Sequence, residues 1–466
     1  MKLFNQLNFF DRSSLLLFSI LPISIIVGNA SININILLID ILFLVYCLKY
    51  KLWSWIKKDV FLYLIVLYIF LIVNSLYSYF ILFENQVNHL LEDGGTLRSI
   101  LFIKYILLIF AFSILLKKIN ILNIIHKSWL VIIAIIILDI FFEKFFGKNI
   151  IGNISPDRSR IVSFFKDELV VGGLVFCFGY TSTTYFINNQ ESNKSILPII
   201  LIFLLIPLSV FVTGEKSNFI KSILLFFVII YFFQKYKRDV NYKILLISVI
   251  FLITCFYNFS NISNNKYREV IKRLPFFHGT QVQLRKTISE LTVPNSAYSN
   301  KDHPNHKIAV EEVLALREQK KSFLSSFTDL KYFAHYDVAL LIFKKYPISG
   351  VGNKNFRLEC HKDEYFRKNF SFSRARCVTH PHQIHFEILS EQGILGYFLI
   401  LLFILWFSIK NIKISIRNKN VYHFSNTAYL LIFFIPLLPG GGIFSTFNGS
   451  IFWIIFSLVN LDYEKN

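Results

Sequence analysis

The chain has 466 residues, of which 54% are hydrophobic, and it carries a formal net charge of +20 at pH 7. Repeated apolar runs of about 17 to 25 residues are long enough to cross the hydrocarbon core of a bilayer. The composition therefore excludes a soluble globular protein and predicts an all-α, polytopic membrane protein. No recognisable nucleic-acid-binding module accompanies the basic charge, so no nucleic acid is expected as a partner.

Twelve apolar segments are expected to span the membrane. The first begins near Leu15, lacks a small-residue cleavage site and is followed at once by another apolar run, so we interpret it as a retained helix and not as a signal peptide. The predicted spans cover residues 14–28, 33–48, 60–83, 99–116, 129–146, 168–187, 196–213, 218–233, 244–259, 387–408, 422–438 and 444–461.

These spans divide the chain into three parts: helices 1 to 9 (residues 1–259), a loop domain (260–386) and helices 10 to 12 (387–466). Lys and Arg are enriched in alternate connecting segments, and short cytoplasmic loops hold an excess of such residues. The segment 410–419 is basic, whereas the segment 439–443 on the opposite side carries no Lys or Arg. This alternation predicts cytoplasmic termini and an outward-facing loop domain.

The loop domain holds 21 of the 49 basic residues and 8 of the 11 histidines. Long domains are translocated largely regardless of charge, so this basicity is compatible with an outside location. Apolar periodicity predicts an amphipathic helix over Lys307–Phe323 and another over His335–Lys345, ending before Pro347. An anionic head group emerging from the membrane would suit the positive charge, although a solvated, mixed-charge surface explains it equally well.

Two cysteines of the loop domain, Cys360 and Cys377, lie just before a histidine-rich segment. In an oxidising compartment a disulfide between them would stabilise this segment by on the order of 3 kcal/mol. Two independent free thiols are the alternative. Cys47, Cys177 and Cys255 lie in apolar spans, where an isolated thiol usually acts as a small hydrophobic side chain.

The most informative stretch is residues 380–396, which read His-Pro-His-Gln-Ile-His-Phe-Glu-Ile-Leu-Ser-Glu-Gln-Gly-Ile-Leu-Gly. It places titratable groups at a membrane surface, directly before an apolar span. A second pattern is Pro-Ile-Ser-Gly-Val-Gly-Asn-Lys-Asn-Phe at residues 347–356. The glycines of this second pattern predict a tight turn, and those of the first predict close helix packing. Pro-Gly-Gly-Gly at residues 439–442 predicts an outer re-entrant or hinge segment.

These patterns resemble the O-antigen ligase and polymerase superfamily of bacterial membrane glycosyltransferases. His382-Gln383, nine residues and then Gly393-Ile-Leu-Gly396 are similar to its signature, in which a His followed by Asn, Ser or Gln precedes Gly-x-x-Gly and opens a membrane helix. Residues 347–356 are similar to its Pro-x-x-Gly-x-Gly-x-x-x-Phe segment. Residues 157–165 and 213–217 resemble outer-side segments of the same family, whose architecture is twelve spans with one large periplasmic loop.

The resemblance covers about residues 155–460 and implies glycan transfer from a polyprenyl-pyrophosphate-linked donor to a sugar hydroxyl. The reaction would take place at the periplasmic face of the bacterial inner membrane, among membrane lipids. The acceptor would be another lipid-linked repeat unit for a polymerase, or a lipid A-core sugar for a ligase. Family members are thought to need no metal or other cofactor, and inversion at the anomeric carbon is expected.

The family motif implies that His382 is the catalytic base, because a neutral imidazole can take the proton of an acceptor hydroxyl. Other polar residues nearby are candidate supporting groups: His335, His380, His385 and Gln383. For His380 and His385, local hydrogen bonding is a simpler explanation than catalysis.

The departing pyrophosphate requires positive charge. At the outer end of the seventh span the family has Ser-Arg, whereas this chain has Glu215-Lys216, which replaces a forked donor by a point charge. Lys216 is expected to hold the phosphate, and Arg158 or Arg160 to supply the planar contact. A second family arginine falls near residues 331–335, where this chain has none. Interfacial anchoring or pairing with neighbouring carboxylates would explain these cations equally well.

Two other functions remain open at this stage. Suitable ligand types for zinc are present without a recognised zinc spacing: His361, His380, His382, His385 and Cys360. A transporter or permease, for a small solute or a lipid-linked glycan, would place ionisable groups near the middle of the membrane. Only Asp40 and Asp139 look intramembrane, and no internal repeat is detectable, so the sequence favours the enzyme.

Overall fold

The computed structural model describes residues 8–82, 95–117, 119–157, 160–166, 168–189, 197–236, 331–367 and 375–461. Every regular element within these ranges is helical, which confirms the all-α class. The ninth predicted span (244–259), the helix expected over Lys307–Phe323 and Arg158 lie outside the described residues.

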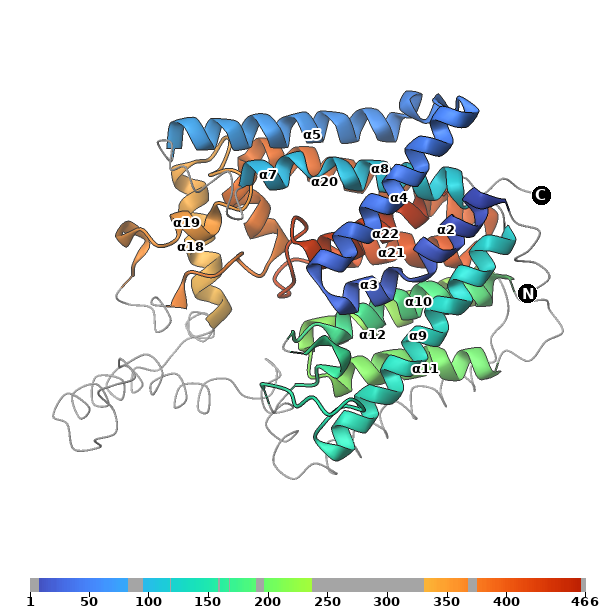
Figure 1. Ribbon diagram of the computed structural model, residues 1–466. Helices are drawn as coiled ribbons and strands as arrows, with labels where there is room; N and C mark the ends of the chain where they lie inside the picture. The colour runs from blue at the N-terminus through green and yellow to red at the C-terminus, as the bar shows by residue number, and fades with distance from the viewer. Residues whose placement is uncertain are drawn as a thin grey trace, which may run out of the picture.

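Helices from the N-terminal half form one side of the bundle in Figure 1. Their bounds are α2 (Phe9–Ser19), α3 (Leu21–Val27), α4 (Asn29–Tyr50), α5 (Asp59–Tyr77), α7 (Gly95–Ile100), α8 (Ile103–Leu115) and α9 (Ile119–Phe146). Short helical turns cover η1 (Ser54–Lys57), η2 (Ser78–Leu82) and η3 (Ser163–Phe165).

The remaining elements include the helices that carry the predicted motifs. Their bounds are α10 (Val171–Asn189), α11 (Leu197–Val212), α12 (Lys216–Tyr236), α18 (Lys331–Lys345), α19 (Phe356–Glu359), η4 (Asp363–Tyr365), α20 (Ile384–Asn418), α21 (Val421–Phe433) and α22 (Thr446–Val459).

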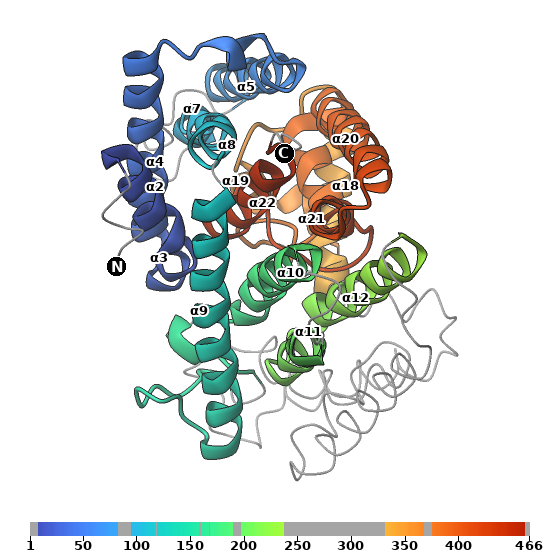
Figure 2. The same ribbon diagram turned by 90° about the vertical axis from the view of Figure 1, so that its right-hand side faces the viewer.

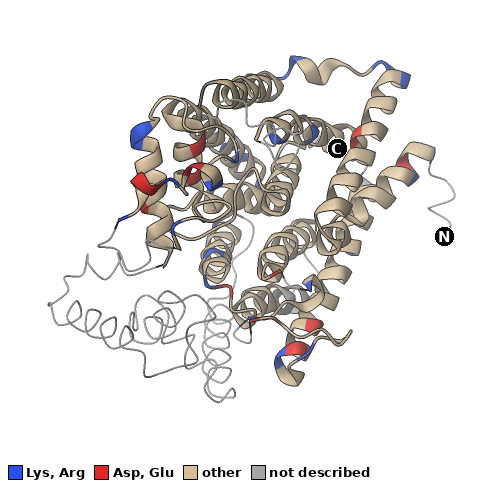
Figure 3. Ribbon diagram, turned by 60° about the vertical axis from the view of Figure 1, so that its left-hand side comes forward, with Lys and Arg blue, Asp and Glu red and all other residues tan. Residues whose placement is uncertain are grey.

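Helices α10 and α21 lie at the centre of the bundle. Helix α10 packs against α9, α11, α12 and α21, and α21 packs against α12, α20 and α22 as well (Figure 2). Helices α18 and α19 lie beyond one end of the bundle, next to the start of α20 (Figure 1). Charged residues are sparse along the bundle helices and are more frequent at helix ends and connecting segments (Figure 3).

Among the described residues, six helical segments are long and apolar enough to cross a membrane: α4, α5 with its extension to Phe80, α7 with α8, α9, α12 and α20. A seventh would result if α2 and α3, which are bent by 45°, form one span. Other described helices, such as α10, α21 and α22, coincide with predicted spans without meeting both criteria. The structure therefore supports a multi-pass protein, and the count of twelve and the sidedness of the loop domain stay predictions.

Helix α20 is interrupted at Gly393, whose φ of 62° lies in the left-handed region. The turn formed by residues 347–352 packs into this break. Four backbone hydrogen bonds join the two segments: Val351 N–H to Ser390 O (3.0 Å), Gly352 N–H to Glu391 O (2.8 Å), Ile394 N–H to Pro347 O (2.8 Å) and Leu395 N–H to Ile348 O (3.3 Å). The turn thereby satisfies backbone groups that a break would otherwise leave without partners.

Only glycine fits at the point of closest approach. A Cβ atom at Gly393 would lie 2.2 Å from the carbonyl oxygen of Ile348, and one at Gly350 would lie 2.5 Å from the backbone of Glu391. The sequence predicted close helix packing for both glycines of the Gly393–Gly396 pair. Gly396 does pack this way, because its Cβ would lie 2.8 Å from the ring of Phe70 in α5. Gly393 instead creates the break.

Substitution of Gly393 should therefore destabilise the protein more than substitution of a glycine that has only a left-handed conformation. Gly147 provides a matched control, because its φ is 73° and no atom lies within 4 Å of a Cβ built there. We expect Gly147→Ala to cost about 1 kcal/mol and Gly393→Ala more than about 3 kcal/mol, because backbone must also move. Thermal unfolding in detergent would measure both, and equal losses would contradict the proposed packing.

Candidate functional site

Three histidines from two segments meet at the end of the bundle. The ring centroids of His380 and His382 lie 4.4 Å apart, and those of His335 and His382 lie 5.6 Å apart. The ring of Tyr332, which like His335 belongs to α18, meets His382 edge to face at 5.5 Å. The structure thus brings together the proposed base and two of its four candidate supporting residues.

His382 adopts a backbone conformation that is unusual for a residue other than glycine, with φ at 58°. Two contacts hold it there. The side-chain oxygen of Gln383 caps α20 by accepting hydrogen bonds from the amides of His385 (2.8 Å) and Phe386 (3.1 Å). The amide of Gly440 donates to the carbonyl oxygen of His382 at 2.7 Å. Left-handed residues held by their surroundings are typical of functional sites.

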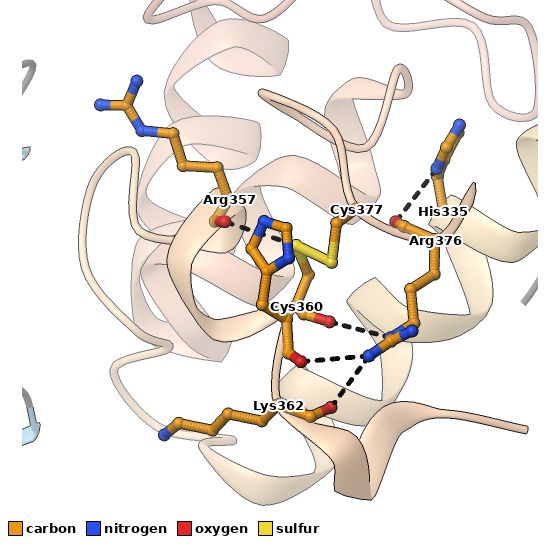
Figure 4. The surroundings of a disulfide bond; sticks show 7 residues. His335, Arg357, Cys360, Lys362, Arg376 and Cys377 are labelled. Carbon is orange, nitrogen blue, oxygen red and sulfur yellow. Dashed lines mark hydrogen bonds between the residues drawn. A yellow bond between two sulfur atoms is a disulfide. The ribbon is translucent and has the colours of Figure 1, made fainter. Parts of the chain in front are cut away.

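A disulfide between Cys360 and Cys377, whose Cα atoms lie 5.4 Å apart, closes the segment behind the histidines. The neighbouring Arg376 folds back across it, and its side chain donates to the carbonyl oxygens of Cys360 (3.0 Å) and His361 (3.1 Å) (Figure 4). The carbonyl oxygen of Arg376 lies 3.1 Å from Nδ1 of His335. Because a carbonyl oxygen only accepts, Nδ1 of His335 carries the proton, and Nε2 is the basic nitrogen of the neutral ring.

His380 is held in its neutral form. Burial lowers its pKa to about 4, and the nearby positive charge of Lys354 acts in the same direction. At neutral pH this residue therefore adds no positive charge beside His382.

His385 points away from the cluster. Its Nε2 donates to the carbonyl oxygen of Phe434 at 2.7 Å, and its Nδ1 lies 3.1 Å from the hydroxyl of Tyr397. Both ring nitrogens are thus used to fix the start of α20 against the end of α21. The structure gives His385 a local hydrogen-bonding role, as the simpler interpretation of the sequence expected.

A buried ion pair lies next to the cluster, and sequence reasoning missed it. Nζ of Lys354 lies 3.4 Å from Oε1 of Glu387, and both side chains are almost completely enclosed. The amide of Lys354 donates to Glu391 at 2.9 Å. Glu387 lies one turn beyond Gln383 along α20, so this pair ties the residues after the Gly-Val-Gly turn to the helix that follows His382. The positions of Lys354 and Glu387 in the sequence do not indicate that their side chains form an ion pair.

The two segments that carry the predicted phosphate-binding residues, both expected on the outer side, lie against each other. The amide of Ile161 donates to Thr213 O at 3.1 Å. Nη2 of Arg160 donates to Leu169 O at 2.6 Å, and its guanidinium also interacts electrostatically with the buried Glu215. Burial raises the pKa of Glu215, and Arg160 opposes that rise. Lys216 directly follows, half-buried, as the first residue of α12.

The segment Pro439–Gly442 joins these cations to the histidines. The hydroxyl of Ser217, next to Lys216, donates to the carbonyl oxygen of Pro439. The following residue, Gly440, donates to His382 as described above. The sequence assigned this segment no role beyond a hinge, and its position between α12 and the start of α20 shows how it connects the two halves of the site.

One group of potential metal ligands occurs in the described part of the chain: Cys360, His361 and Cys377. The two sulfur atoms share a disulfide, so they are not available as thiolates. The ligand set considered from the sequence, which included His380, His382 and His385, does not form such a group.

Fold and site together define a multi-pass helical membrane protein with a histidine cluster and buried cations at one end of its bundle. Residues 200–401, from α11 into α20, match the family model described as O-antigen ligase. This match supports the O-antigen ligase and polymerase superfamily, and the resemblance seen in the motifs is confirmed over this region. No curated protein matches the chain.

The match indicates a glycosyltransferase-like enzyme of polysaccharide biosynthesis in a bacterial membrane, with lipid-linked glycans as its class of substrate. Both the histidine cluster and Lys216 lie inside the matched region. The segment around Arg160 lies before it.

The buried pair of Lys354 and Glu387 provides a test of the site's construction. Lys354→Met should destabilise the protein by about 3 kcal/mol, because it leaves a buried carboxylate without a counter-ion, and the double variant with Glu387→Gln should regain much of that loss. Lys362→Met is the control, since Lys362 is exposed and its partner Glu359 keeps Lys345 as a second cation. Thermal unfolding in detergent measures these three variants and the unaltered protein, and a double variant no more stable than Lys354→Met would contradict the pairing.

Proposed function

We propose that the protein transfers a glycan from a polyprenyl-pyrophosphate-linked donor to a sugar hydroxyl at the periplasmic face of the bacterial inner membrane. The observation that carries this proposal is the cluster of His335, His380 and His382, which lies within the region matching the O-antigen ligase model. The predicted orientation, with the loop domain outside, supplies the choice of face.

In the proposed reaction the acceptor oxygen forms a bond to the anomeric carbon of the donor. The bond from that carbon to the phosphate oxygen breaks, and its electron pair leaves with the polyprenyl pyrophosphate. His382 accepts the proton of the acceptor hydroxyl. Attack and departure on opposite faces of the sugar invert the anomeric configuration, as when a base activates water in inverting hydrolysis.

The neighbouring histidines support His382 in different ways. His335 is held by the carbonyl oxygen of Arg376, so it presents its ring in a defined orientation. His380 stays neutral because its pKa is lowered to about 4. His380 therefore places no positive charge beside the base, where such a charge would make proton acceptance by His382 less favourable.

Lys216 and Arg160 are the described cations proposed for the donor pyrophosphate, together with Arg158. Their charges would neutralise the leaving group, so the proposed reaction uses no metal or other cofactor. The charge of Arg160 is shared with Glu215. Lys216 is proposed to hold the phosphate because it stands at the position where the family has an arginine.

Replacement of His382 gives the direct test. We expect His382→Ala to lower glycan transfer by about 10²- to 10⁴-fold, the range of a general-base contribution, without unfolding the protein. His385→Ala is the matched control, because it removes a histidine of the same segment whose ring nitrogens bond elsewhere. Transfer should be measured with purified, reconstituted variants whose expression and monodispersity are equal.

Two outcomes would contradict the assignment. Near-normal transfer by His382→Ala would exclude this residue as the base. Equal losses in His382→Ala, His380→Ala and His385→Ala would indicate a structural cluster instead of one catalytic residue.

A polymerase and a ligase share this donor chemistry and differ in the acceptor. The long outer loop and the lack of the second family arginine near residues 331–335 favour a polymerase. We therefore expect a deletion strain to carry lipid A-core capped with a single repeat unit. Bare core with accumulated lipid-linked polymer would identify the protein as the ligase.

A further inference from the structure

Lys221 of α12 is a buried cation to which neither the motifs nor the proposed reaction has assigned a role. Its side chain is only 4% exposed. Among the residues that the structure describes, its Nζ lies 5.6 Å from the ring centroid of Phe433, and no carboxylate or hydrogen-bond acceptor pairs with it. Burying an ammonium group without an anionic partner is costly. A bound anion would offset that cost.

The position of Lys221 connects it to the histidine cluster. Nζ lies 3.2 Å from the point that a Cβ atom of Gly440 would occupy. The amide of the same Gly440 donates to the carbonyl oxygen of His382 at 2.7 Å. One glycine therefore separates the Lys221 ammonium from the backbone of the proposed base.

Other cations near this point differ from Lys221 in their surroundings. Lys354 is also buried, but its charge is matched by Glu387. Lys216 is half-buried at the first residue of α12, whereas Lys221 lies about 7.5 Å further along the helix axis at 1.5 Å per residue. Lys221 is thus the deeper cation of the helix, and its charge is not neutralised by the described residues.

We propose that the Lys221 ammonium binds a non-bridging phosphate oxygen of the donor's pyrophosphate, an inference that rests on the function proposed above. When the bond from the anomeric carbon to the phosphate oxygen breaks, the electron pair moves onto that oxygen. Lys221 stabilises the resulting negative charge from the α12 side, while His382 receives the acceptor proton on the other side of Gly440. A fixed cation in an enclosed site is well suited to this task.

If Lys221 binds phosphate, one substitution should affect stability and ligand binding differently, which a purely structural lysine would not do. Lys221→Met keeps an unbranched side chain that is one heavy atom shorter, and it removes the charge. It should leave the thermal stability of the ligand-free protein unchanged or raise it, because a buried charge without a partner is removed. It should also weaken binding of farnesyl pyrophosphate, a short polyprenyl pyrophosphate, by about 10- to 100-fold, the range for loss of one charge-assisted hydrogen bond.

The experiment compares four purified proteins in detergent: the unaltered chain, Lys221→Met, Lys221→Arg and Lys235→Met. Lys235 is the matched control, because it lies exposed at the other end of α12. Binding is measured with farnesyl pyrophosphate and with farnesol, which lacks the phosphates. Lys221→Arg should bind within a few-fold of the unaltered protein, Lys235→Met should be unchanged, and farnesol should not distinguish the variants.

The result also separates this inference from the proposed function. If the unaltered protein transfers glycan and binds farnesyl pyrophosphate, but Lys221→Met binds it equally well, the role of Lys221 is refuted and the function stands. A Lys221→Met protein that loses stability and keeps its affinity would identify a structural lysine. Absence of transfer by the unaltered protein would instead refute the proposed function.

Discussion

The site depends on the four backbone hydrogen bonds that join the turn at residues 347–352 to the break in α20. Helix α18, which carries His335, ends just before this turn, and α20 begins just after His382. The two histidines therefore come from elements that are clamped together where the chain would otherwise have unsatisfied amides and carbonyls. Because Gly350 and Gly393 approach within the space of a single methyl group, the clamp leaves little freedom for the two segments to shift.

Around this clamp, the buried charges fall into two kinds. Lys354 and Glu387 neutralise each other and hold the backbone after the turn against α20. Lys221, on the other side of the cluster, has no such partner among the described residues. A buried pair is expected to fix geometry, whereas an unmatched buried charge lowers stability and is retained where a ligand uses it. The Lys354–Glu387 pair is therefore assigned to the architecture of the site, and Lys221 to its proposed chemistry.

Local sequence patterns predicted the parts of the site that lie close together along the chain. His380 and His382, the Gly-Val-Gly turn and the start of α20 all follow from one short region, and the helix expected at His335–Lys345 begins only four residues earlier, at Lys331. The interruption at Gly393 was not predicted, because an apolar run reads as one continuous helix whether or not another segment inserts into it. In the structure, residues 347–352 insert into the helix at this point and supply the missing backbone hydrogen bonds.

Contacts between distant segments could not be predicted from one sequence. Lys354 with Glu387, and Lys221 with Gly440, involve charged or small residues that are ordinary in their own surroundings. The spans were predicted from apolar length, which identified helices but not how many of them cross the membrane. Family motifs supplied His382 and Lys216, and packing in three dimensions supplied the segment Pro439–Gly442 that lies between them.

The central claim, glycan transfer from a lipid-linked donor, is tested most directly by analysing the products of the purified protein in liposomes. A synthetic polyprenyl-pyrophosphate-linked glycan would be supplied together with a glycan acceptor. The account predicts free polyprenyl pyrophosphate and a new glycosidic bond whose anomeric configuration is the inverse of that in the donor. Unchanged donor, or movement of the intact lipid-linked glycan to the opposite leaflet without a new bond, would contradict it and indicate a transporter.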